Sequence, residues 1–67
     1  MNAIRLVRND DGTSTLYYFD CVVGHIDRVR YQRTGERAWR AVMHLTGQIH
    51  YARTKEAARR VLMENYA

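Results

Sequence analysis

Three glycine-containing turns divide this chain into segments of alternating polarity, and they constrain its fold more than any other feature. The turns are Asp10-Asp11-Gly12, Thr34-Gly35-Glu36 and Thr46-Gly47-Gln48. A three-residue hairpin loop has a type I turn followed by a left-handed residue, and glycine suits that last position. If each turn is such a loop, the apolar residues of its flanking segments share one face. The pattern therefore predicts antiparallel hairpins joined into a meander.

The first turn predicts a hairpin between a strand over residues 3–9 and a strand over residues 14–20. In this register Leu6 pairs with Leu16, and Ile4 pairs with Tyr18. The segment that follows, residues 21–26, is ambiguous. Its glycine, Gly24, fits either a turn or a bulge within one long strand, because glycine in a strand marks either feature.

The second and third turns predict strands over residues 26–33 and 37–45 and a further strand after residue 48. On one face the predicted pairs are Tyr31–Trp39, Val29–Ala41, Leu45–Ile49 and Met43–Tyr51. On the other face they are Arg30–Arg40, Arg28–Val42 and His44–His50. The apolar face needs a cover, since a small sheet must bury one side to be stable.

A helix is predicted over residues 54–66. Thr54 is a suitable N-cap, and Glu56 lies in the first turn, where a negative charge is favourable. The apolar side of this helix consists of Ala57, Ala58, Val61, Leu62 and Tyr66. We therefore expect an α+β fold, in which an antiparallel meander of four to five strands is packed on one face by a C-terminal helix. Trp39 is expected to be largely buried against that helix.

The length of 67 residues predicts a single domain, 1–67, with an N-terminal hairpin over 1–23 and a sheet-plus-helix part over 24–67. Domains of this size bury little surface and often need an additional stabilising element. The only cysteine, Cys21, cannot form an internal disulfide. A homodimer is one arrangement that would supply the missing stability.

The charge distribution points to an anionic partner. The formal net charge is +4, and Lys55 is the only lysine among eleven basic residues. Arginine presents a planar fork of donors that suits phosphates and guanine edges. The predicted register gathers polar residues on the sheet face away from the helix, and we expect them to bind double-stranded DNA. This predicted site consists of Arg28, Arg30, Gln32, Arg40, His44 and His50.

Residues 24–67 resemble the sheet-type DNA-binding domain shared by plant ethylene-response (APETALA-type) factors and the arm-binding domains of phage and transposon integrases. The matching pieces are Arg28-Val29-Arg30-Tyr31-Gln32, Trp39-Arg40-Ala41-Val42-Met43, Gly47, and Thr54-Lys55-Glu56-Ala57-Ala58-Arg59. The resemblance implies that outward residues of the sheet enter the major groove, which assigns this role to Arg28, Arg30, Arg40 and His44. Residues 1–23 have no counterpart in that pattern, and the strand before the helix lacks its glycine-then-aromatic ending.

Other chemistry finds little support in the sequence. The spacing of Cys21, His25, His44 and His50 matches no known zinc-finger spacing, so no metal or cofactor is expected. Asp20 and Asp27 are too isolated to predict an acid–base pair, and we do not expect an enzyme. Residues 1–9 alternate in polarity, unlike a secretory signal, and no segment is apolar enough to span a membrane. We expect a cytoplasmic protein.

Two alternatives to DNA binding remain open from the sequence. The chain could be a small phage-encoded interaction protein that binds a host protein, as anti-CRISPR inhibitors do, instead of a regulator from a phage or plasmid. It could also bind RNA, with an exposed Tyr17 or Phe19 stacking on bases. These two aromatics could equally belong to a second small core under the N-terminal hairpin.

Overall fold

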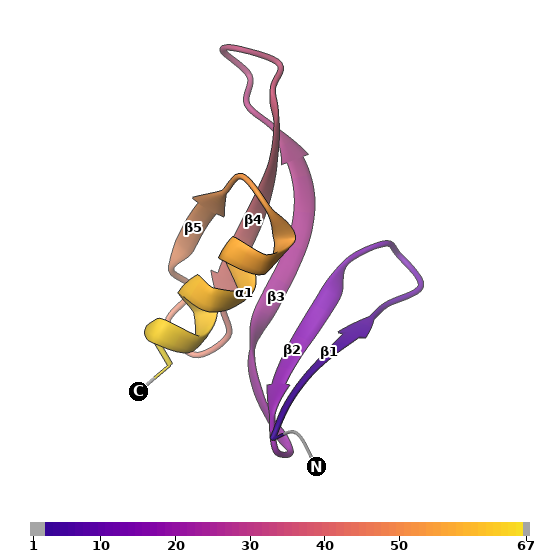
Figure 1. The fold of residues 1–67 in the computed structure, drawn as a ribbon, viewed down its shortest axis with the longest axis vertical. Helices are drawn as coiled ribbons and strands as arrows, with labels where there is room; N and C mark the ends of the chain where they lie inside the picture. The colour runs from indigo at the N-terminus through magenta and orange to yellow at the C-terminus, as the bar shows by residue number, and fades with distance from the viewer. Residues whose placement is uncertain (1–2, 67) are drawn as a thin grey trace.

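The computed structural model describes residues 3–66, which form one five-stranded antiparallel sheet with a helix packed on one of its faces (Figure 1). The strands follow one another in chain order across the sheet. Their bounds are β1 Ile4–Arg8, β2 Ser14–Tyr18, β3 Cys21–Arg30, β4 Arg37–Met43 and β5 Ile49–Ala52, and the helix α1 is Lys55–Glu64. The predicted α+β meander with a C-terminal helix is confirmed.

The first hairpin has the predicted register, with Leu6 opposite Leu16 and Ile4 opposite Tyr18. Gly12 has φ +89°, the left-handed conformation expected of the third loop residue. Asp11 fixes the turn, because its carboxylate accepts hydrogen bonds from the Thr13 hydroxyl at 2.7 Å and the Thr13 backbone N–H at 3.0 Å. These two hydrogen bonds lower the pKa of the Asp11 carboxyl below its ordinary value.

Gly24 lies at a β-bulge and not at a turn. Leu16 pairs with Gly24, whereas the next residue, Tyr17, pairs with Val22, so Val23 is the extra residue in β3. The connection between β2 and β3 is a two-residue turn at 19–20, closed by the pair Tyr18–Cys21. The second strand therefore ends at residue 18 and not at residue 20 as predicted.

The second and third turns are longer than predicted, and both have the same construction. Gly35 donates its N–H to the Tyr31 carbonyl at 2.7 Å, and Tyr31 donates its N–H to the Glu36 carbonyl at 3.0 Å. Gly47 and Gln48 make the equivalent contacts with Met43, at 2.9 and 2.8 Å. Each loop thus has four residues between its closing pair, so the predicted three-residue loops are wrong.

This longer loop changes which residues share a face. Ala41 lies opposite Ile26 on one side and His50 on the other, not opposite Val29 as predicted. The β3–β4 and β4–β5 registers are each displaced by three positions from the predicted ones. An odd displacement exchanges the two faces of a strand relative to its neighbour. Several residues expected in the core are consequently on the uncovered face or in the loops: Val29, Tyr31, Leu45, Ile49 and Tyr51.

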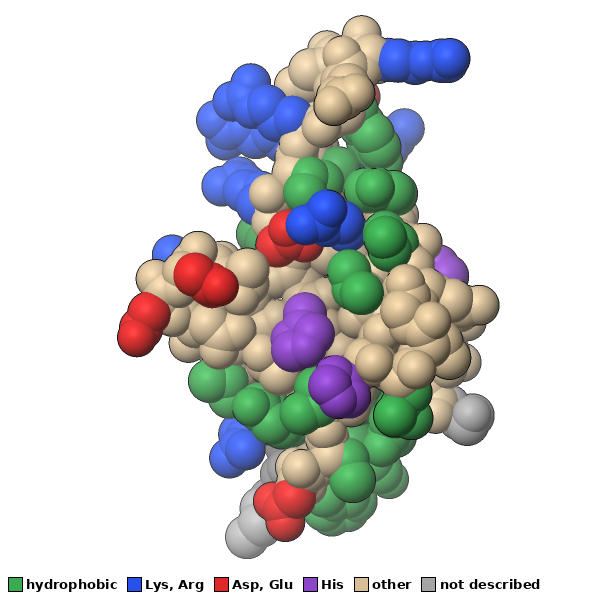
Figure 2. All heavy atoms as spheres, turned by 180° about the vertical axis from the view of Figure 1, so that it is seen from behind, with side chains coloured by type: hydrophobic (Ala, Val, Ile, Leu, Met, Phe, Trp, Pro, Cys, Tyr) green, Lys and Arg blue, Asp and Glu red, His purple; other side chains and the backbone are tan. Residues whose placement is uncertain are grey.

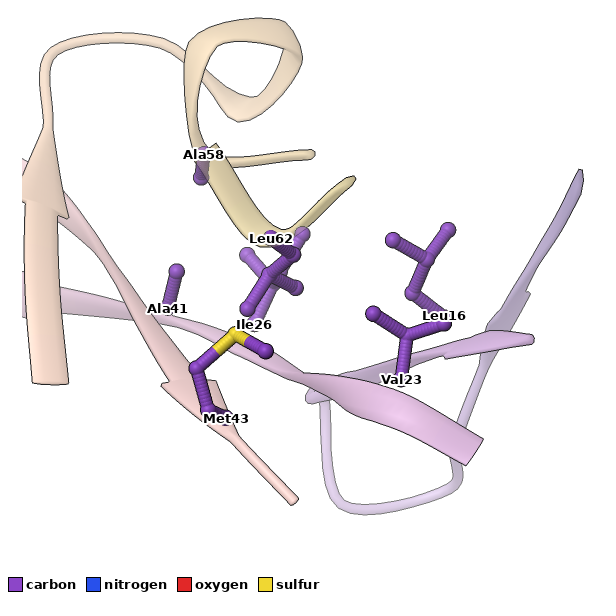
Figure 3. Packing of buried hydrophobic residues seen from close by; sticks show 7 residues of the cluster. All are labelled: Leu16, Val23, Ile26, Ala41, Met43, Ala58 and Leu62. Atoms are coloured by element: carbon purple, nitrogen blue, oxygen red, sulfur yellow. The ribbon is translucent and has the colours of Figure 1, made fainter. Parts of the chain in front are cut away.

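The core lies between α1 and the sheet. It is a single cluster of buried residues among those described, comprising Leu16, Val23, Ile26, Ala41, Met43, Ala58 and Leu62. Figure 3 shows Leu62 of the helix pointing into the sheet beside Ile26 and Met43, with Leu16 and Val23 side by side further along. The bulge thus places Val23 in the core, and the N-terminal hairpin shares this core and has no second one.

The helix begins as predicted and ends slightly earlier. The Thr54 hydroxyl accepts a hydrogen bond from the Ala57 N–H at 3.0 Å, which confirms the predicted N-cap. Of the predicted apolar side, Ala58 and Leu62 are fully buried. Within residues 3–66, no helix is both long enough and apolar enough to cross a membrane.

Candidate nucleic-acid interface

The six residues of the predicted site do not form one surface. We call the sheet face that α1 covers the helix face and the other the open face. Arg28 and Arg30 belong to the helix face, because every second residue of β3 faces the same side and both follow the buried Ile26 at that spacing. His50 belongs to the helix face because it pairs with the buried Ala41. Arg40 is on the open face, and Gln32 and His44 lie in the loops. The predicted convergence on the open face is therefore wrong, and the cause is the three-position displacement of both registers.

Arg40 already has a carboxylate partner on the open face. Its Nε donates to one oxygen of Asp27 at 3.0 Å and its Nη2 to the other, across the β3–β4 pair. These hydrogen bonds and the charge of Asp27 raise the pKa of the Arg40 guanidinium above its ordinary value. Because the two charges offset each other, this pair adds little net positive charge to the open face.

The two histidines of the predicted site are also apart. His44 lies edge-on to His25 with the ring centroids 5.8 Å apart, and Figure 2 shows a pair of histidines near the centre of the open face. His50 lies opposite Ala41 on the helix face, and its Nε2 is buried without a hydrogen-bond partner in the described part of the chain. The predicted pair of His44 with His50 is therefore wrong.

A different group of cationic side chains lies together in the structure, and it includes Arg37, which was not selected from the sequence. Arg30 lies directly opposite Arg37, and Arg28 lies opposite Trp39, all on the helix face. The guanidinium of Arg28 is 5.3 Å from the centre of the Trp39 ring, and the ammonium of Lys55 is 5.8 Å from it. Arg28, Arg30 and Arg37 also line one surface hollow. Arg37 lies opposite Arg30 only because the loop between β3 and β4 has four residues, and the predicted three-residue loop therefore left it out of this group.

This group lies on a projecting two-stranded ribbon. Pairing of β2 with β3 reaches no further than Ile26, and pairing of β5 with β4 no further than Trp39. The β3–β4 hairpin from the Arg28–Trp39 pair outward, residues 28–39, therefore has only two strands beyond that first pair, and its tip extends past the sheet and the helix (Figure 1). We call this segment the basic ribbon.

The arginines of the basic ribbon have no acidic partner. The ion pairs among residues 3–66 are Arg40–Asp27 and Arg59–Glu56. Neither includes Arg28, Arg30 or Arg37. Like charges directly opposite each other in a sheet are destabilising. An anionic partner would offset this repulsion at the Arg30–Arg37 pair.

The open face has a different character. Figure 2 shows hydrophobic and histidine side chains over much of it, with one basic and one acidic side chain in contact near its upper part. Exposed apolar residues there include Ile49 and Tyr51, at 52% and 53% relative exposure. Of the two alternatives left open for the hairpin aromatics, Phe19 is exposed, at 64%, whereas Tyr17 is half-buried under Arg5.

Within residues 3–66, no group of three or more histidine, cysteine or acidic side chains is arranged to hold a metal ion. Comparison of the chain with protein-family models, curated proteins and solved structures finds no match. The docking mode implied by the resemblance would present the open face to DNA, but Arg28 and Arg30 are not on that face.

Proposed function

We propose that this chain is a small DNA-binding module that contacts duplex DNA through the basic ribbon. The observation that carries the proposal is the Arg30–Arg37 pair, two arginines directly opposite each other, neither of which forms an ion pair with a carboxylate within residues 3–66. Arg28 extends the same surface by one further pair along the ribbon. Three guanidinium groups so placed would bind successive phosphates or a guanine edge.

The shape of the ribbon supports duplex DNA as the partner. The major groove of B-form DNA admits a two-stranded β-ribbon, and the basic ribbon has only two strands beyond the Arg28–Trp39 pair. The packed helix and β5 stop short of its tip, so they would not obstruct its entry into the groove. A module of this kind would act as a regulator or accessory factor, and we propose a mobile element as its source.

The test is fluorescence anisotropy with a labelled random-sequence duplex at a series of salt concentrations. Each phosphate contact contributes about 0.9 to the slope of log K against log salt. Arg30→Ala and Arg37→Ala should each reduce the slope by about 0.9 and weaken binding to all sequences. Arg60→Ala is the matched control, because Arg60 is an exposed arginine on α1 outside the ribbon.

Equal effects of Arg37→Ala and Arg60→Ala would show that only total charge matters and would refute the ribbon as the contact element. The melting curve of Arg60→Ala should overlap with that of the wild type, since Arg60 is outside the core. Those of Arg30→Ala and Arg37→Ala should lie at or slightly above it, because each substitution removes one of two opposed like charges and neither side chain belongs to the core.

A protein partner is the second candidate function. It is favoured by the exposed apolar side chains of the open face and its adjoining loop, where Leu45 is 82% exposed and Ile49 52%. A wild-type chain that binds no nucleic acid at low salt would favour this candidate. The open face would then be the surface to substitute, and an anti-CRISPR-type role becomes the leading proposal.

A further inference from the structure

A second hollow lies on the other side of the basic ribbon, and it combines aromatic and polar side chains. Its lining residues are Val29, Arg30, Tyr31, Gln32, Arg40 and Tyr51. Tyr31 and Tyr51 are exposed, and their ring centroids are 5.7 Å apart with the ring planes inclined by 50°. Neither ring belongs to the core cluster. The core therefore does not account for these two exposed rings.

The polar side chains of this hollow suit an uncharged, planar ligand with hydrogen-bonding edges. Asp27 holds the Arg40 guanidinium in place and offsets its charge, but the guanidinium has further N–H groups to donate. The carboxylate of Asp27 would repel a phosphate at this position. Gln32 offers both a donor and an acceptor from the adjoining loop.

The hollow is connected to the proposed DNA contact. Arg30 lines both this hollow and the one formed with Arg28 and Arg37. A nucleic-acid backbone held at Arg30 would therefore pass the rim of the aromatic hollow. Unpaired bases stack on tyrosine rings and bond through their edges to arginine and amide side chains.

We infer that the hollow between Tyr31 and Tyr51 binds an unpaired nucleobase, so that the chain prefers a junction between duplex and single-stranded DNA over a continuous duplex. The inference rests on the proposed function, because Arg30 and its neighbours would hold the adjoining backbone. The base would stack on Tyr51 or Tyr31 while Arg40 and Gln32 contact its edge.

The experiment compares three labelled DNAs: a blunt duplex, the same duplex with a single-stranded tail of about eight nucleotides, and the same duplex with an abasic tail of that length. The two tailed DNAs have equal charge and differ only in the bases of the tail. Stacking on one aromatic side chain is worth about 1 kcal/mol or more. The wild type should therefore bind the base-containing tail at least about fivefold more tightly than the abasic tail.

Tyr51→Ala should weaken this preference for bases, and the double variant Tyr31→Ala/Tyr51→Ala should abolish it. Tyr51→Phe should retain most of it because the stacking ring remains. Tyr17→Ala is the matched control, since Tyr17 is on the same face beside Arg5 but pairs with Val22 at the far end of β3. It should leave the preference unchanged.

The outcomes separate the two proposals. Equal binding of the two tailed DNAs, or a preference that survives removal of both Tyr31 and Tyr51, would overturn the base site while leaving the ribbon proposal intact. Binding of the tailed DNA without binding of the blunt duplex would support the base site and refute the duplex proposal. Absence of binding to all three DNAs at low salt would refute both.

Discussion

Replacing Gly24 with alanine should destabilise the fold more than any other glycine substitution. An alanine Cβ at this position would lie 2.4 Å from the Val42 carbonyl oxygen and 2.8 Å from Cδ2 of Leu62. The leucine side chain can move, but the carbonyl belongs to the neighbouring strand, so β3 and β4 would have to separate. Overpacking of this kind typically costs about 1–3 kcal/mol. We expect a loss near the upper end, about 3 kcal/mol, because backbone must shift.

For a domain of this size, about 1 kcal/mol corresponds to about 4–8 °C in melting temperature. Gly24→Ala should therefore lower the melting temperature by about 12–24 °C, measured by circular dichroism. Gly47→Ala is the matched control, because nothing lies within 4 Å of its added Cβ and only its φ of +72° is unfavourable. That strain is about 1–2 kcal/mol, partly offset by reduced freedom of the unfolded chain. If Gly24→Ala melts at or above the melting temperature of Gly47→Ala, the expected clash between the added Cβ and the Val42 carbonyl oxygen is refuted.

Three further predictions concern stability and can be measured by urea unfolding. His50→Leu should raise the free energy of unfolding by about 1 kcal/mol, because it removes a buried ring nitrogen that has no hydrogen-bond partner among residues 3–66; a lower free energy of unfolding would show that Nε2 is hydrogen-bonded in solution. Thr54→Ala should lower it by about 1 kcal/mol through loss of the N-cap, whereas Thr54→Ser should not. Trp39→Ala should lower it by about 2 kcal/mol, below the range of about 3–5 kcal/mol for a fully buried tryptophan, because Trp39 is only half-buried.

The elements themselves were predictable because local chemistry determines them. Asp10-Asp11-Gly12 is a turn whose geometry its own residues specify, and the register that it sets is correct to the residue. Thr54 caps the helix through a contact three residues away, which sequence spacing alone reveals. These contacts involve neighbours in the chain, so no tertiary information was needed.

The registers around β4 were not predictable in the same way. In each loop a threonine hydroxyl accepts a hydrogen bond from the N–H two residues later, at Thr34 with Glu36 and at Thr46 with Gln48. The same triplet fits both a three-residue and a four-residue loop. Apolar alternation favoured the wrong choice, because it placed Ile49 and Tyr51 with Met43 in the core. The structure instead puts these two side chains on the open face.

The error in register carried over directly to the candidate site. Arg28 and Arg30 form no ion pair among residues 3–66, but the predicted register grouped them with Arg40, which has Asp27 as its partner. That ion pair forms only when β3 and β4 have the observed register. Arg37 was missed for the same reason. A residue's charge is evident from the sequence, but whether another charge offsets it depends on cross-strand pairing.

The corrected register makes the basic ribbon chemically two-sided. Alternation along β3 and β4 places Arg28, Arg30 and Arg37 toward the helix face, while Arg40, tied to Asp27, lies on the open face near Tyr51. A uniformly basic ribbon would attract phosphates on both sides and would not distinguish duplex from single strand. A ribbon that is cationic on one side and aromatic on the other can hold a backbone and an unpaired base at once. Under the two proposals the cationic side would hold the backbone and the aromatic side would hold the base, and the comparison of base-containing and abasic tails measures the second of these contributions.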